Sequence, residues 1–175
     1  DAEGRLSTVT DTLGRDITVS YGPQGFVSAV TDFEGRSVRY AHHADGDAGG
    51  SFGDLKSVTT PSVTGTPNGD DFPSGRTTTY TYSKGFTDER LNHNLLTITD
   101  PKGQTWLRNN YNATQTASDL GFDRVRSQTF GNANEISTFH YALQVPDATN
   151  GFARIKAIVN DRVGNVGEYL YDAGN

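Results

Sequence analysis

Hydrophobic and polar residues alternate in several short segments of the chain, each of which contains tyrosine. In the first of these segments, Ile17, Val19 and Tyr21 alternate with polar residues. The same period of two recurs in three further segments, residues 38–40, 78–82 and 169–171. A period of two is typical of β-strands, because successive side chains point to opposite faces of a sheet. The pattern therefore predicts an all-β protein built from short strands.

A different spacing precedes these alternating segments. Two apolar residues lie three positions apart there, as do Leu6 and Val9 or Leu95 and Ile98. In a regular strand, a step of three residues places two side chains on opposite faces. Either a β-bulge returns both side chains to one face, or both faces of the strand are partly covered. The sequence leaves these two alternatives open.

An Asp-x-x-Gly step separates the two kinds of segment. It separates them at Asp11 and Gly14, at Asp32 and Gly35, at Asp100 and Gly103, and at Asp161 and Gly164. Asp followed three residues later by Gly fits a type I turn that continues into a residue with positive φ. The carboxylate can also accept a hydrogen bond from the backbone N–H two residues on. We therefore predict that these residues form the corners of β-hairpins.

The same strand, corner and strand recur along the whole chain. Alignment on the corner gives six units, approximately residues 1–21, 22–40, 52–82, 91–111, 121–141 and 152–171. Loop insertions near residues 41–54 and 61–74 interrupt the pattern. We expect one aromatic rung in each unit, formed by Tyr21, Tyr40, Tyr82, Tyr111, Tyr141 and Tyr171. Because a lone hairpin is marginal in water, these repeated antiparallel hairpins should pair side by side in one curved sheet.

Composition excludes several classes of function. The net charge is −6, and Lys and Arg are scattered, so nucleic acid is not an expected partner. No apolar run approaches the roughly 18 residues of a membrane span. The chain has no Cys and no Met and begins on Asp1, so we expect it to derive from a longer polypeptide. The open edges of its sheet would then pair with further repeats or with other copies.

One segment has the composition of a weak metal site. His42, His43, Asp45 and Asp47 lie close together in the sequence, and imidazole and carboxylate groups bind divalent cations. Adjacent His residues point apart on a strand, however, and Asp45 and Asp47 supply only part of a calcium loop. We therefore predict a solvated polar loop, with no bound metal or other cofactor.

No pattern in the chain favours catalysis. The Asp residues recur with the period of the turns, as structural corners require, whereas a catalytic pair would be unique. The tyrosines and Trp106 could stack against a sugar, but their positions on strands favour packing between neighbouring strands. We therefore predict that the protein is not an enzyme.

The repeated phrase resembles the YD repeat, also called the Rhs repeat. The segment DAEGRLSTVTDTLGR matches nearly every fixed position of that repeat, and VTDFEGRSVRY, ITDPKGQTW and YLYDAGN are partial copies. Rhs toxins, the B and C components of insecticidal toxin complexes, wall-associated proteins and teneurins carry such repeats. The resemblance implies a segment of a spiralling β-shell that encloses a toxin polypeptide within a large secreted bacterial protein.

Two other functions remain open from the sequence. The repeats could form an extracellular adhesin at the cell surface that binds glycans or proteins through its tyrosines and Trp106. Alternatively, the fragment could assemble with copies of itself through its open edges. Solvent-facing aromatic rungs would favour the adhesin, and a size that depends on concentration would favour self-assembly.

Overall fold

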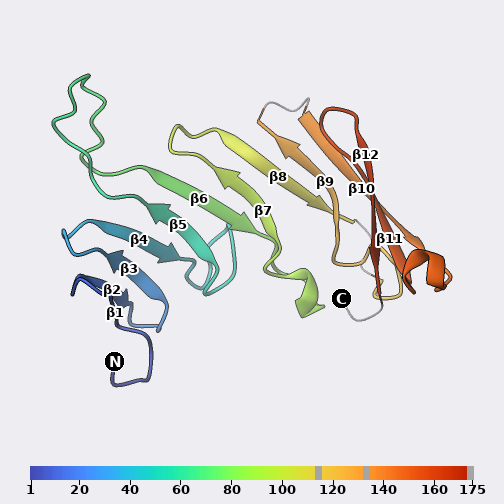
Figure 1. The fold of residues 1–175 in the computed structure, drawn as a ribbon, viewed down its shortest axis with the longest axis horizontal. Helices are drawn as coiled ribbons and strands as arrows, with labels where there is room; N and C mark the ends of the chain where they lie inside the picture. The colour runs from blue at the N-terminus through green and yellow to red at the C-terminus, as the bar shows by residue number, and fades with distance from the viewer. Residues whose placement is uncertain (113–115, 132–134, 173–175) are drawn as a thin grey trace.

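The structure, a computed structural model, describes residues 1–112, 116–131 and 135–172. It contains one antiparallel sheet of twelve strands, whose order in the sheet follows the sequence (Figure 1). The strands are β1 (Thr8–Thr10), β2 (Asp16–Tyr21), β3 (Val27–Thr31), β4 (Ser37–His42), β5 (Leu55–Thr59), β6 (Thr77–Tyr82), β7 (Leu95–Thr99), β8 (Thr105–Tyr111), β9 (Val125–Phe130), β10 (Glu135–Leu143), β11 (Ile155–Asn160) and β12 (Val166–Tyr171). Two short 3-10 helices, η1 (Glu89–Leu91) and η2 (Ala148–Asn150), lie in connecting loops. The prediction of an all-β fold is confirmed.

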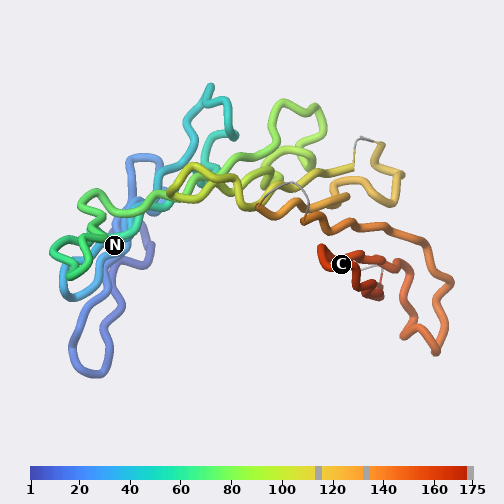
Figure 2. Tube along the Cα trace, turned by 90° about the horizontal axis from the view of Figure 1, so that it is seen from above, coloured from blue at the N-terminus to red at the C-terminus, as the bar shows by residue number. Residues whose placement is uncertain are grey.

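Consecutive strands form six hairpins, which we number 1 (β1–β2) to 6 (β11–β12). Figure 2 shows that the sheet bends into an arch, with loops 43–54 and 83–94 on its outer side. Strand β4 runs to His42, two residues beyond the second predicted unit. In hairpin 3, the insertion at residues 61–74 contains an isolated bridge between Val63 and Phe72. The corner of hairpin 5 and the end of the last YD-like copy fall at residues 132–134 and 173–175, outside the described residues.

The two faces of the sheet carry different side chains. On one face, apolar partners lie opposite each other across the strands, as Val19, Val30 and Val38 do in hairpins 1 and 2. The other face carries Thr and Ser, whose hydroxyls pair across strands. These pairs are Thr31 with Ser37 at 2.7 Å, Thr59 with Thr77 at 2.9 Å and Thr81 with Thr97 at 2.6 Å. Cross-strand pairs on both faces therefore hold the sheet together.

The register of the strands decides the question of the three-residue spacing. Wherever one of the first four hairpins pairs with the next, one residue at the start of the new hairpin has no partner on the preceding strand. These extra residues are Ser28, Lys56, Leu96 and Arg126. Each one is a β-bulge, so the apolar residues on either side of it return to the same face. Val27 and Val30, for example, lie opposite Tyr21 and Val19.

The same bulges end the pairing inside each hairpin. The last paired residue on the first strand of hairpins 2 to 5 follows the bulge directly, and these residues are Ala29, Ser57, Thr97 and Ser127. Hairpin 6 has no bulge where β10 pairs with β11, and its strands stay paired as far as Ile155 and Tyr171. Since a bulge bends its strand away from the next one, hairpins 2 to 5 are open at the end opposite the corner.

The sheet is a single layer with little core. Among the described residues, the buried apolar side chains are those of Leu91, Leu107, Ala153 and Ala157, and no side chain is fully buried. Two of these residues, Leu91 and Ala153, belong to the loops that connect successive hairpins. Connecting loops therefore contribute as much to the buried apolar side chains as the strands do.

Candidate functional site

The four predicted corners share one geometry. In each, Asp Oδ1 accepts hydrogen bonds from the backbone N–H groups two and four residues on, at 2.8–3.0 Å. The Gly at the fourth position donates its N–H to the Asp carbonyl and has a φ between +75° and +91°. The backbone and side-chain donors of Arg15 lower the pKa of the Asp11 carboxyl. In all four corners the Asp Oδ1 atom is thus occupied by the turn itself.

The tyrosine rungs close the open ends of hairpins. Tyr21, Tyr111 and Tyr141 donate their hydroxyl groups to the backbone carbonyls of Leu6, Leu95 and Val125 at 2.8, 3.3 and 3.0 Å. In each case the accepting carbonyl lies two residues before the last residue of the first strand that pairs within the same hairpin. The widening of the hairpin leaves these carbonyls without a partner on the other strand, and an unpaired backbone carbonyl costs free energy where water cannot reach it. The tyrosine hydroxyls supply the missing donors.

Two arginines extend this arrangement. Arg5 and Arg124 directly precede the first apolar residue of hairpins 1 and 5, and their guanidinium groups lie 4.3 and 5.2 Å from the ring centroids of Tyr21 and Tyr141. Arginine above an aromatic face is a favourable cation–π contact. Sequence reasoning missed this role, although the Gly-Arg-Leu at the start of the chain was a visible signal.

The second unit places its rung residue differently from the others. Tyr40 lies opposite Val58, two residues nearer the corner than the end of the ladder. Its counterpart in hairpin 3 is Tyr80, which lies opposite Ile98. In hairpins 1, 3 and 4, a tyrosine lies opposite the residue directly before the bulge, and these tyrosines are Tyr21, Tyr82 and Tyr111. In hairpin 2 this position is held by His42, which lies opposite Leu55. His42 stacks on Phe26 at a centroid distance of 4.9 Å. Tyr171 occupies a rung position in hairpin 6, opposite Ile155, but remains 43% exposed.

Loop 43–54 fills the open end of hairpin 3. The His43 side chain is 5% exposed, and its Nε2 lies 3.2 Å from the carbonyl oxygen of Tyr80. The backbone N–H of Tyr82 donates to the carbonyl of Gly49 at 2.7 Å. Strand β5 does not pair with Tyr80 and Tyr82 of β6. The loop pairs with them instead, through the His43 imidazole and the Gly49 carbonyl.

The four weak metal candidates do not converge. His43 Nδ1 lies 3.2 Å from Asp47 Oδ2, which also accepts from Lys56 Nζ at 2.9 Å. The hydrogen bond from Lys56 is the main cause that lowers the pKa of Asp47 to about 2. His42 is stacked on Phe26, and Asp45 is exposed. Within the described ranges no group of three or more His, Cys, Asp or Glu could hold a metal ion.

Neighbouring connecting loops contact one another along the side of the sheet opposite the corners. His93 Nδ1 lies 2.7 Å from Asp54 Oδ1, which joins loops 83–94 and 43–54. Asn94 Nδ2 donates to Asp123 Oδ1 at 2.8 Å, which joins loop 83–94 to loop 112–124. Phe26 and Phe52 make an edge contact at 5.5 Å between the first two loops. These contacts tie hairpins together beyond their strand pairing.

A groove near the corners carries the one tryptophan of the sequence. It has a volume of about 710 Å³ and is lined in part by Trp106, Phe130, Ser137 and Val163. Trp106 is an extra residue of β8 relative to β7, and such a bulge re-aims a side chain. Arg162 reaches across from hairpin 6, lies 5.4 Å from the Phe130 ring and pairs with Glu135 at 2.9 Å. Trp106 is 44% exposed in this groove.

The two outer strands leave the sheet open at both ends. In the described sheet, β1 pairs with β2 alone and β12 pairs with β11 alone. Large side chains of the apolar face are exposed in the hairpins at these two ends, namely Val9 and Ile17 at one end and Tyr169 and Tyr171 at the other. The apolar face thus continues to both edges, where no neighbouring strand covers it.

Comparison with known proteins finds a similarity to a repeat family at the start of the chain. The family model described as RHS Repeat matches residues 1–37, which span hairpin 1 and the beginning of hairpin 2. No curated protein matches the chain. In the part of the chain that the structure describes, no helix has both the length and the apolar character to cross a membrane.

Proposed function

We propose that this chain, whose residues 1–37 match the RHS repeat model, forms part of the wall of a β-shell. The shell would enclose and shield a toxin polypeptide within a large bacterial protein that is secreted or displayed at the cell surface. The observation that carries the proposal is the arch-shaped sheet, whose apolar face continues to two unpaired edges (Figure 2).

The construction of the sheet suits a wall. A single layer encloses a volume with few residues, but it has little core to stabilise it. Lateral links supply what the core lacks, through cross-strand hydroxyl pairs, tyrosine rungs and contacts between connecting loops. Open strand edges favour association, and further hairpins of the same kind would cover them. The corner carboxylates are occupied by their turns, which supports a structural role over an enzymatic one.

The proposal is tested on the native protein. An antibody against this chain would identify the product in its source, and we expect a mass far above 18.9 kDa. Protease treatment of the purified native protein should leave a second polypeptide intact until the shell is opened by denaturant. A native product of about 18.9 kDa would contradict the proposal, because six hairpins cannot surround a folded domain.

The groove at Trp106 favours a second candidate, an adhesin-like module that binds a glycan or a protein. Exposed Trp and Arg side chains are frequent at binding surfaces, and Trp106 and Arg162 line one groove. Since Trp106 is the sole tryptophan in the chain, its fluorescence reports directly on the groove. A panel of neutral oligosaccharides should change the emission of the wild-type protein if this candidate is correct. Unchanged emission throughout would exclude glycans as the ligand.

A further inference from the structure

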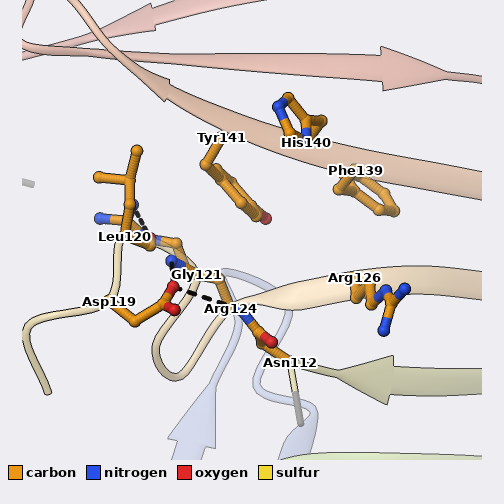
Figure 3. A pocket seen from close by; sticks show the side chains of 9 residues that line it. All are labelled: Asn112, Asp119, Leu120, Gly121, Arg124, Arg126, Phe139, His140 and Tyr141. Atoms are coloured by element: carbon orange, nitrogen blue, oxygen red, sulfur yellow. Dashed lines mark hydrogen bonds between the residues drawn. The ribbon is translucent and has the colours of Figure 1, made fainter. Parts of the chain in front are cut away.

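A cavity of about 210 Å³ lies at the open end of hairpin 5 (Figure 3). Its walls include Leu120 and Gly121 of the connecting loop, Arg124 and Arg126 at the start of β9, and Phe139 and Tyr141 of β10. The bulge at Arg126 ends the pairing of β9 with β10, whose last paired residues are Ser127 and Thr138. The cavity therefore occupies the place where the ladder of hairpin 5 would otherwise continue.

The backbone of β10 faces this cavity. The N–H of Gln144 donates to the carbonyl of Arg154 at 2.9 Å, on the side of β11. Backbone groups alternate in direction along a strand, so the even-numbered residues here face β11. The odd-numbered residues Phe139 and Tyr141 consequently turn their N–H and C=O groups toward β9, and beyond Thr138 no paired residue of β9 lies there.

Hairpin 3 shows how such a place is filled. Tyr80 and Tyr82 hold the positions in β6 that Phe139 and Tyr141 hold in β10. The carbonyl of Tyr80 lies 3.2 Å from His43 Nε2, and the N–H of Tyr82 donates to the Gly49 carbonyl at 2.7 Å. A turn-rich loop thus supplies a donor from the His43 side chain and an acceptor from the Gly49 backbone. In hairpin 5, Gly121 is buried in the described part of the connecting loop but has no side chain, and a cavity remains.

The charges around the cavity are mainly positive, in a chain whose net charge is −6. Arg124 lies over Tyr141 and donates to the Leu120 carbonyl at 2.8 Å. Arg126 is exposed, and among the described residues it has no ion pair or hydrogen bond. The single acidic residue in the lining, Asp119, already accepts the Gly121 N–H at 2.7 Å. A carboxylate entering the cavity would therefore meet Arg126 as a free partner.

We propose that this cavity binds an acidic segment of another polypeptide. A backbone carbonyl of the segment accepts from the Tyr141 N–H, a donor of the segment reaches the Phe139 carbonyl, and an Asp or Glu side chain pairs with Arg126. Main-chain hydrogen bonds to an exposed strand provide affinity, and the charged contact provides selectivity. The proposal does not depend on whether the protein encloses a cargo.

The experiment uses the whole chain and the capped peptide HADGDAGG, which is the sequence of residues 43–50 that fills the equivalent place in hairpin 3. Backbone NMR of the isotope-labelled protein follows the titration. We expect the Tyr141 amide to shift and to become protected from hydrogen exchange, whereas the Ala142 amide, which faces β11, stays unchanged. Arg126→Gln should weaken binding by roughly threefold to tenfold.

Two matched controls separate this site from others. Arg39→Gln removes another exposed strand arginine far from the cavity and should leave binding unchanged. A peptide with both Asp residues replaced by Asn should bind as weakly to the wild type as the original peptide binds to Arg126→Gln. The proposal is overturned if Phe139 and Tyr141 do not respond at millimolar peptide, or if the Asn peptide binds equally well. Shifts confined to β1 and β12 would also overturn it, because the peptide would then pair with the sheet edges.

Discussion

The hydroxyl group of Tyr141 offers the clearest test of how the open hairpins are stabilised. It donates to the Val125 carbonyl at 3.0 Å, next to the bulge where pairing in hairpin 5 stops. Tyr141→Phe removes this donor and leaves the ring, with its contact to Arg124, in place. The change therefore isolates one hydrogen bond from the packing of the rung.

The expected loss of stability depends on which other hydrogen bonds the accepting carbonyl keeps. A hydrogen bond of this kind contributes about 1 kcal/mol net, and more if the remaining group is left without a partner. Tyr141→Phe should thus lower the free energy of unfolding by about 1 kcal/mol. Tyr111→Phe should cost less, because the Leu95 carbonyl keeps the hydrogen bond from Asn109 Nδ2 at 2.9 Å. In the described part of the chain the Tyr40 hydroxyl has no hydrogen-bond partner, so Tyr40→Phe should be close to neutral.

Urea unfolding followed by circular dichroism measures these three variants against the wild type. We expect the order Tyr141→Phe, Tyr111→Phe, Tyr40→Phe from the largest loss of stability to the smallest. For a chain of this length the first should lower the Tm by about 3 °C. Equal effects of Tyr141→Phe and Tyr40→Phe would refute the reasoning, since they would show that the hydroxyl contact at the bulge contributes nothing.

Three further predictions concern the corners and loop 43–54. Gly75 and Gly103 both have positive φ, +74° and +80°, but a Cβ on Gly75 would overlap the Thr60 carbonyl whereas one on Gly103 meets open space. Gly103→Ala should therefore cost about 1 kcal/mol for its conformation alone, and Gly75→Ala clearly more, in the same urea assay. His43→Ala should cost about 3 kcal/mol, because it empties a filled site and exposes the Tyr80 carbonyl, whereas His140→Ala at an exposed position should have little effect. The pKa of Asp47 is lowered to about 2 from 3.8, so its stabilising contribution is complete above pH 4 and is lost as the pH falls toward 2. Asp47→Asn should therefore flatten the dependence of the free energy of unfolding on pH in that window. An unchanged slope would contradict the role assigned to Asp47.

Local features of this fold could be predicted from the sequence. The Asp-x-x-Gly corners depend on hydrogen bonds within five residues, so the residues that form them stand together in the chain. Strand alternation is likewise local, and it predicts the all-β class. The three-residue spacing was ambiguous, because a bulge and a strand covered on both faces give the same apolar pattern until the partner strand is known.

The rung in hairpin 2 shows where residue type misled the prediction. Tyr40 was chosen because the other units end in tyrosine. Counting from the corner is more reliable, since Tyr21, His42, Tyr82 and Tyr171 each lie seven residues after a corner glycine. That count assigns His42 to the rung position, and the register agrees. The chemical identity of a repeat position can change while its distance from the corner is kept.

Contacts between distant residues could not be predicted in this way. His43 and Tyr80 are separated by 37 positions, and the cavity in hairpin 5 depends on how a connecting loop meets β10. The sequence near His43 indicated only a polar loop. Its two adjacent glycines were the available signal, because Gly50 lies so close to the His43 ring that no side chain would fit there.

One inserted residue per repeat explains most of the architecture. The bulges at Ser28, Lys56, Leu96 and Arg126 keep the apolar residues on one face and also stop the ladder within each hairpin. The resulting open ends have to be filled, and tyrosine hydroxyls, His43 and the connecting loops fill them. Hairpin 6 serves as the internal comparison. Its apolar residues Ile155 and Val159 lie four positions apart, its ladder is continuous, and Tyr169 and Tyr171 remain exposed. The spacing of two apolar residues thus determines whether a hairpin opens and requires a filler. In hairpin 5, the filler leaves a cavity that is lined by two arginines.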